Sequence, residues 1–195
     1  MLVLGIDPGT RRLGWGVVRG EGNRAVHIGH GVIHASEKLS LAARLLTLDH
    51  ELARVIERYR PEVGSVESLF FHKDAQAAAK LGHARGVVLL SLQRAEVAVV
   101  EYPPARVKLA ITGNGRAEKI QVAQLVKMML NLNGLPEPDA ADALALAVTH
   151  LRRAPIEARL AEAQHRASVH PALKPARRRR ASDARRLAKA LGPAR

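Results

Sequence analysis

Four acidic residues stand at the ends of predicted strands and helices, where together they could bind divalent metal ions. Asp7 follows an apolar run that is typical of a buried strand, and Glu67 ends a second predicted strand. Asp139 and Asp142 are three residues apart at the start of a predicted helix and share one of its faces. If the two strands are parallel neighbours and the helix crosses their carboxyl ends, the four carboxylates converge.

Four converging carboxylates cannot all stay ionised without cations, and their hard oxygen atoms suit Mg²⁺ or Mn²⁺. Two divalent ions would nearly neutralise them and could support attack of water on a phosphodiester. This chemistry needs no side-chain nucleophile, and the chain contains no cysteine. Each residue also has an ordinary explanation. Asp7 could cap the turn at Pro8–Gly9, and a helix N-terminus favours anions by ~0.3–1 kcal/mol each.

The elements that must position these residues follow from hydrophobic periodicity. Ser40 is a candidate N-cap for a helix that Pro61 ends, Pro103 and Pro104 close a later strand, and Pro138 stands in the first turn of another helix. Strands are expected at 2–7, 14–18, 25–33, 62–68 and 96–104, and helices at 40–60, from Asp74 to about 95, from about 119 to 131, and from 138 onward. This order predicts an α/β protein with a mixed five-stranded sheet flanked by helices.

The chain has 195 residues and a formal net charge of +13, most of it near the end. Residues 151–195 contain 13 Lys and Arg against three acidic residues. We expect one folded domain at 1–155 and a basic, flexible extension at 156–195. A polyanion, nucleic acid first, is the expected partner, although a solvated basic tail is the alternative. A block of arginines should bind phosphates without reading sequence: Arg177, Arg178, Arg179 and Arg180.

Neither a signal peptide nor an apolar run long enough for a membrane helix is recognised, and cysteine is absent. We therefore expect a cytoplasmic protein.

Five sequence blocks, in this order, resemble the RuvC family of bacterial Holliday-junction resolvases: GIDPGTRRLGWGVV, VESLFF, KLGHARGV, GNGRAEKIQV and DAADALALAVTHL. The resemblance covers about residues 1–153. It implies an RNase H-like fold and a dimeric, metal-dependent endonuclease that cuts two opposed strands of a four-way DNA junction. The family's four acidic positions fall on Asp7, Glu67, Asp139 and Asp142 without substitution.

The resemblance also implies roles for residues around these acids. Lys108 and Lys119 match lysines near the scissile phosphate, and Arg116 could assist them. Phe70 and Phe71 follow Glu67 closely, and the resemblance favours Phe70 for stacking on an unpaired base. The alternatives are solvated surface lysines and a pair of core phenylalanines.

A two-fold symmetric junction also suits a two-fold symmetric protein. The resemblance places the dimer interface on the second helix, around Leu81, Gly82, Gly86 and Leu89, where ordinary core packing is the alternative. It further suggests partnership with the RuvA–RuvB branch-migration complex.

Two other functions stay open from the sequence. A non-catalytic junction-binding protein would share the basic surface but would not need the four carboxylates. An actin-like or sugar-kinase-like ATPase also begins with a strand and an Asp-x-Gly-Thr turn, but such folds usually need two of these domains. The choice between Mg²⁺ and Mn²⁺ and the preferred cleavage sequence cannot be read from the residues.

Overall fold

The computed structural model describes residues 1–22, 24–68 and 75–169. Along the chain the elements are β1 (Leu2–Asp7), β2 (Arg12–Glu21), β3 (Arg24–His34), α1 (Leu41–Tyr59), β4 (Val63–Glu67), α2 (Ala75–Arg94), β5 (Ala98–Tyr102), α3 (Pro104–Thr112), α4 (Lys119–Met129) and α5 (Pro138–Val169). The chain divides into two units, residues 1–156 and 157–195. Among the described helices, none combines the length and apolarity that crossing a membrane requires.

The five strands form one mixed sheet in the order β3-β2-β1-β4-β5. β2 pairs antiparallel with both β1 and β3, whereas β4 pairs parallel with both β1 and β5. The predicted α/β class and the mixed sheet are therefore confirmed. So is the prediction that the strands ending at Asp7 and Glu67 are parallel neighbours.

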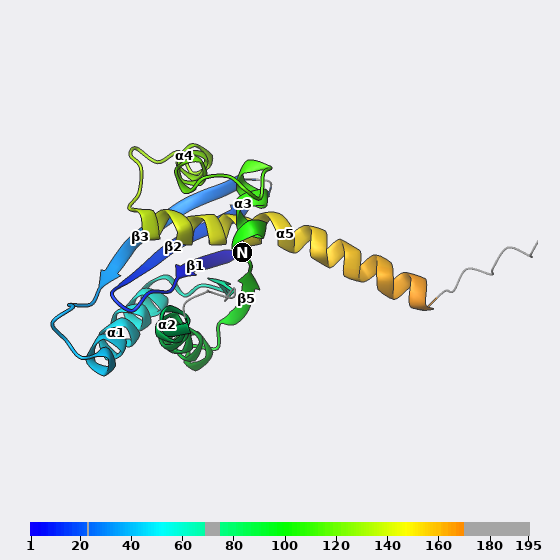
Figure 1. Cartoon of the computed structure of the whole chain (residues 1–195). Coiled ribbons are helices and arrows are strands. Elements are labelled where there is room, and N and C mark those ends of the chain that lie inside the picture. The colour runs from blue at the N-terminus through cyan, green and yellow to red at the C-terminus, as the bar shows by residue number, and fades with distance from the viewer. Residues whose placement is uncertain (23, 69–74, 170–195) are drawn as a thin grey trace, which may run out of the picture. The chain divides into compact units, whose positions relative to one another are not determined.

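Helices cover both faces of the sheet (Figure 1). α1 and α2 pack on one face, where Leu48, Leu52 and Leu92 belong to one apolar core. α3, α4 and the start of α5 lie on the other face, where Val126 and Leu144 belong to a second core. β1 is consequently buried along its length except at its two end residues, and the last of these is Asp7.

A glycine allows the start of α5 to lie directly on the sheet. Gly14 of β2 pairs with Asp7 of β1, and a Cβ atom added to Gly14 would lie 1.9 Å from the backbone oxygen of Asp139. Any larger residue at this position would push the helix away. Farther along α5, Ser65 Oγ of β4 donates a buried 2.9 Å hydrogen bond to the backbone oxygen of Leu146. Together these contacts hold the first turn of α5 at the carboxyl end of β1.

Several predicted element ends are confirmed. α1 begins after Ser40, whose Oγ accepts a 3.3 Å hydrogen bond from the backbone N–H of Ala43, and it ends at Tyr59, just before Pro61. α5 begins at Pro138. The prediction, however, contains no helix between residues 104 and 113, and α3 fills that interval. Proline is tolerated in the first helical turn because the N–H it lacks would have no partner there, so the same residues can end a strand and begin a helix.

α5 continues through Pro155 to Val169, although the helical pattern of the sequence weakens after this proline. The predicted division into residues 1–155 and 156–195 stays a prediction. The suggested helix at 182–192 and the N-cap at Asp74 lie outside the described residues.

Candidate active site

β1 and β4 provide the first two carboxylates of the site. Asp7 is the last residue of β1 and Glu67 is the last residue of β4. The strands run parallel, with Ile6 beside Val66. Because adjacent strands lie ~4.8 Å apart, side chains at their carboxyl ends share one edge of the sheet.

The first two turns of α5 provide the other two carboxylates. Asp139 is the second residue of α5, and its backbone packs against Gly14, the pairing partner of Asp7. Asp142 follows one turn later on the same face of the helix. The helix N-terminus carries a partial positive charge that favours acidic side chains there.

The four carboxylates act on one another electrostatically. Burial, and then the negative charges of Asp142, Glu67 and Asp139, raise the pKa of Asp7 from its usual 3.8 to about 7. The positive charge of Lys119 opposes this shift. All four predicted acidic side chains therefore lie in one region, close enough for three of them to shift the pKa of the fourth.

Two cationic side chains pair with the carboxylates of α5. Lys119 Nζ, at the start of α4, lies 2.7 Å from Asp142 Oδ2, and this hydrogen bond raises the pKa of Lys119. Arg12 Nε, at the start of β2, lies 2.6 Å from Asp139 Oδ2. Arg12 is not among the predicted site residues. No sequence pattern singled it out, because its contact with Asp139 depends on how the start of α5 packs on β2.

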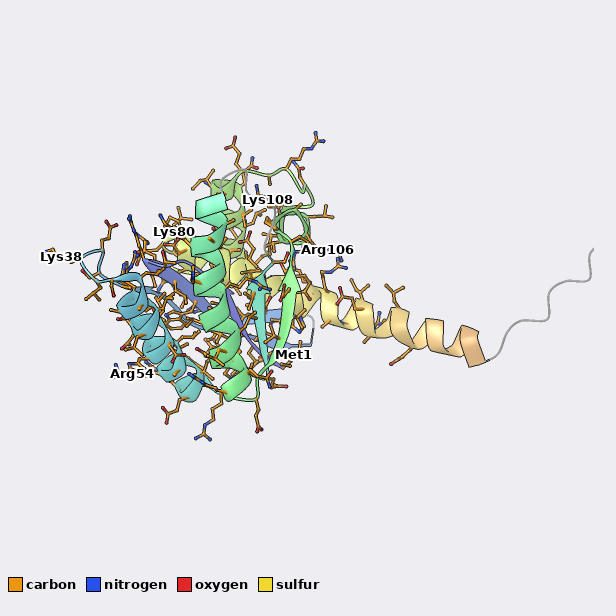
Figure 2. The ribbon with its side chains drawn as sticks, turned by 60° about the horizontal axis from the view of Figure 1, so that its bottom comes forward. Met1, Lys38, Arg54, Lys80, Arg106 and Lys108 are labelled. Carbon is orange, nitrogen blue, oxygen red and sulfur yellow. The ribbon has the colours of Figure 1, made fainter. Side chains whose placement is uncertain are left out.

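A cavity of about 70 Å³ opens beside the carboxylates. Its lining includes Glu67 and Asp142 together with Lys108 and Lys119. Lys108 comes from α3 and is half-buried (Figure 2). Arg116 is exposed in the turn before α4, where its backbone N–H donates a 3.0 Å hydrogen bond to Asn114 Oδ1. Two of the three predicted cations thus line the same cavity as two of the predicted acids.

Other predicted residues lie outside the described part of the chain. These are Phe70 and Phe71, after β4, and Arg177, Arg178, Arg179 and Arg180. Their roles in DNA binding stay predictions.

The chemistry of the donor set fits a hard divalent cation, because four carboxylates offer only oxygen ligands and an excess of negative charge. Within residues 1–22, 24–68 and 75–169, no group of three or more His, Cys, Asp or Glu is arranged so that it could hold a metal ion. Asp139 is paired with Arg12, and Asp142 with Lys119. A metal ion that takes either of these paired oxygens, Asp139 Oδ2 or Asp142 Oδ2, must displace the cation that holds it.

Comparisons with known proteins identify the family of the chain. Residues 3–150 match the family model described as Crossover junction endodeoxyribonuclease RuvC. The chain belongs to the RuvC family. A relative of the same description from Sorangium cellulosum is 56% identical over 181 residues, which cover 93% of this chain and 98% of the relative. By this description, the family consists of crossover junction endodeoxyribonucleases.

Solved structures extend the comparison to the fold. RuvC from T. thermophilus, in complex with a Holliday junction substrate, is 38% identical with a TM-score of 0.76, covering 80% of this chain and 96% of that one. The yeast mitochondrial Holliday junction resolvase Ydc2 is 15% identical with a TM-score of 0.60, covering 84% and 83%. The latter likeness concerns the fold alone. The RNase H-like fold that the sequence blocks implied is confirmed.

Proposed function

We propose that the chain is a structure-selective endonuclease that resolves four-way DNA junctions by two symmetric, metal-dependent cuts during recombination and repair. Membership of the RuvC family supports this function, as does the Holliday junction bound to the T. thermophilus relative. The single observation in this chain that carries it is the rise in the pKa of Asp7 to about 7. This rise reports a carboxylate that is largely buried and that lies near three other carboxylates, as a ligand of divalent cations would.

In this proposal Asp7, Glu67, Asp139 and Asp142 hold two Mg²⁺ or Mn²⁺ ions. Bound ions of this kind supply the Lewis acidity that generates hydroxide from water and stabilises the leaving 3′-oxygen. Carboxylates bind metal in the ionised form, so Asp7 must give up its proton. Its pKa of about 7 places this loss near neutral pH.

The lysines that line the cavity would hold the scissile phosphate. Lys119 can exchange its 2.7 Å contact with Asp142 for a phosphate oxygen when that carboxylate binds metal. Lys108 lines the same cavity and would act as a second point charge. Arg116, exposed in the turn before α4, is placed to add a third phosphate contact.

Regions farther from the acids would contact the rest of the junction. Phe70 or Phe71 would stack on an unpaired base, which is worth ~1–3 kcal/mol. The arginines at 177–180 would bind phosphates without sequence preference.

The protein would act as a homodimer formed through α2, because two identical active sites can then make matched cuts. Within the described residues, a Cβ atom added to Gly82 or Gly86 would meet nothing within 4 Å. The protomer therefore gains no packing from glycine at either position, while glycine costs a helix ~1 kcal/mol relative to alanine. Leu90, one turn beyond Gly86, is 49% exposed. Close approach of a second α2 explains both the glycines and the exposed leucine, with Leu81 and Leu89 flanking the contact.

Partnership with the RuvA–RuvB complex and a cytoplasmic location complete the proposal. The likeness to the RuvC family supports the partnership, and the bacterial source of the relative described above supports the location.

The test is cleavage of a mobile synthetic four-way junction, each strand being labelled in turn, with Mg²⁺, Mn²⁺ or EDTA. We expect ligatable nicks in two opposed strands, and only when a divalent ion is present. Glu67→Gln should abolish the nicks. Glu37→Gln, which removes an exposed carboxylate paired with Arg11, should leave them unchanged. Failure of the unaltered protein to cut in either metal would refute the proposal.

The same assay separates the two alternatives. A non-catalytic junction-binding protein would retain the labelled junction in a gel without nicking it. An actin-like or sugar-kinase-like ATPase would hydrolyse ATP in the absence of DNA, and we expect no such hydrolysis.

A further inference from the structure

Arg12 joins the sheet to the start of α5 through two carboxylates. Its Nε lies 2.6 Å from Asp139 Oδ2, and a terminal nitrogen lies 2.8 Å from Glu137 Oε2. Asp139 has 30% of its side chain exposed, whereas Glu137 has 57% exposed. One arginine therefore bridges a proposed metal ligand and a more exposed carboxylate that is not among the four proposed ligands.

The backbone keeps all three residues in place. Arg12 begins β2 two residues before Gly14, on whose Cα atom the backbone of Asp139 packs. Glu137 precedes the first residue of α5, and its backbone oxygen accepts a 2.8 Å hydrogen bond from the N–H of Ala141. A guanidinium group presents several N–H donors in one plane, so it can hold two carboxylates at once, whereas an ammonium group is a single point charge.

A metal ion that binds Asp139 through Oδ2 must compete with this guanidinium. The guanidinium is a permanent cation, so it must move away if the metal is to take this oxygen. Glu137 makes this exchange feasible, because Arg12 keeps one carboxylate partner after it releases the other.

We propose that Arg12 is a positioning residue that occupies Asp139 while no metal ion is bound, and that releases this carboxylate to the metal while staying bound to Glu137. This inference rests on the proposed function, because it takes Asp139 to be a metal ligand. Arg12 thereby sets the metal concentration at which the site fills. Glu137 retains the guanidinium beside the site, so that Asp139 is paired again when the metal leaves.

Opposite effects are expected from changing Arg12 and Glu137. Arg12→Met removes the competing cation and should lower the dissociation constant for Mn²⁺ about three- to tenfold, as expected for one charge a few ångströms from a divalent ion in a water-exposed site. Glu137→Gln leaves Asp139 as the remaining partner of Arg12 in this bridge, so Arg12 should release Asp139 less readily. The dissociation constant for Mn²⁺ should therefore rise. Arg12→Lys keeps the charge but cannot bridge both carboxylates, so its constant should lie between those of the unaltered protein and Arg12→Met.

The experiment is calorimetric titration of the full-length, DNA-free protein with Mn²⁺. Arg11→Met is the matched control, because Arg11 is the neighbouring arginine and pairs at 2.7 Å with the exposed Glu37. Its dissociation constant should equal that of the unaltered protein. In the double variant of Arg12→Met and Glu137→Gln, the effect of the second change should largely disappear, since Glu137 acts through Arg12.

An Arg12→Met protein with an unchanged or weaker affinity for Mn²⁺ would overturn the inference. So would a Glu137→Gln effect that persists in full without Arg12. If circular dichroism shows that Arg12→Met does not fold, the Glu137→Gln variant provides the test by itself. An unchanged dissociation constant for Mn²⁺ in that variant would then reject the inference. An unaltered protein that neither binds Mn²⁺ nor cuts junctions would refute the proposed function instead. If the unaltered protein binds Mn²⁺ and cuts junctions, but Arg12→Met binds Mn²⁺ with unchanged affinity, only this inference is refuted.

Discussion

Replacement of Asp7 by asparagine should stabilise the metal-free protein at alkaline pH while abolishing DNA cleavage. Burial and three neighbouring carboxylates raise the pKa of Asp7 to about 7 in the folded protein, from 3.8. The folded state therefore binds a proton more tightly at Asp7 than the unfolded state does. Asparagine has nearly the same shape and carries no charge, so it removes the repulsion and keeps the packing.

The sign and size follow from linkage between protonation and folding. Because the folded protein holds the extra proton between pH 3.8 and about 7, its free energy of unfolding falls as pH rises through this window. Above it, ionised Asp7 costs the folded state about 4 kcal/mol, at ~1.4 kcal/mol per pKa unit. With ~2–4 °C for each kcal/mol in a protein of this size, Asp7→Asn should raise the melting temperature by about 10 °C at pH 8.5 and by little at pH 4.

The assay is thermal and urea unfolding of both proteins in EDTA, from pH 4 to 8.5. Glu37→Gln is the control, because it removes an exposed carboxylate far along the chain from the cluster. Mg²⁺ or Mn²⁺ should stabilise the unaltered protein at pH 8.5 more than it stabilises Asp7→Asn, and junction affinity should be largely the same in both. Identical pH dependence of the two proteins in EDTA would refute the reasoning, since neither burial nor the neighbouring carboxylates would then raise the pKa of Asp7 in solution.

Three further results are expected. Gly14→Ala should misplace the start of α5 and greatly reduce cleavage, because the new Cβ would lie 1.9 Å from the backbone oxygen of Asp139. Gly134→Ala is the control, because a Cβ at that position meets nothing within 4 Å. Equal cleavage activity of the two variants would contradict the packing argument. Gly86→Arg should convert a dimer into monomers in sedimentation while Gly134→Arg does not, and an unchanged dimer would exclude α2 as its interface. Removing residues 170–195, which contain nine Lys and Arg, should weaken junction binding while leaving cleavage intact. The slope of log affinity against log salt concentration should become shallower by about 0.9 per lost phosphate contact. An unchanged slope would show that this segment does not contact DNA.

Local sequence patterns predict much of this fold correctly because they depend on neighbouring residues. Ser40 caps α1, Pro138 begins α5, and Asp7 and Glu67 end their strands, as periodicity and turn residues indicated. The same reasoning missed α3 because Pro104 can follow a strand or start a helix, and nothing nearby distinguishes these uses.

The sequence by itself determines which side chains can do chemistry here: four carboxylates with oxygen donors and no cysteine, in an order of blocks that matches the RuvC family. Only the tertiary structure decided which of these groups lie close together and how their charges act on one another. Gly14 lets α5 reach the sheet, the resulting crowding raises the pKa of Asp7, and Arg12 and Glu137, 125 residues apart, meet around Asp139. Electrostatic energies depend on distances between atoms, and those distances are set by the packing of elements that are remote along the chain.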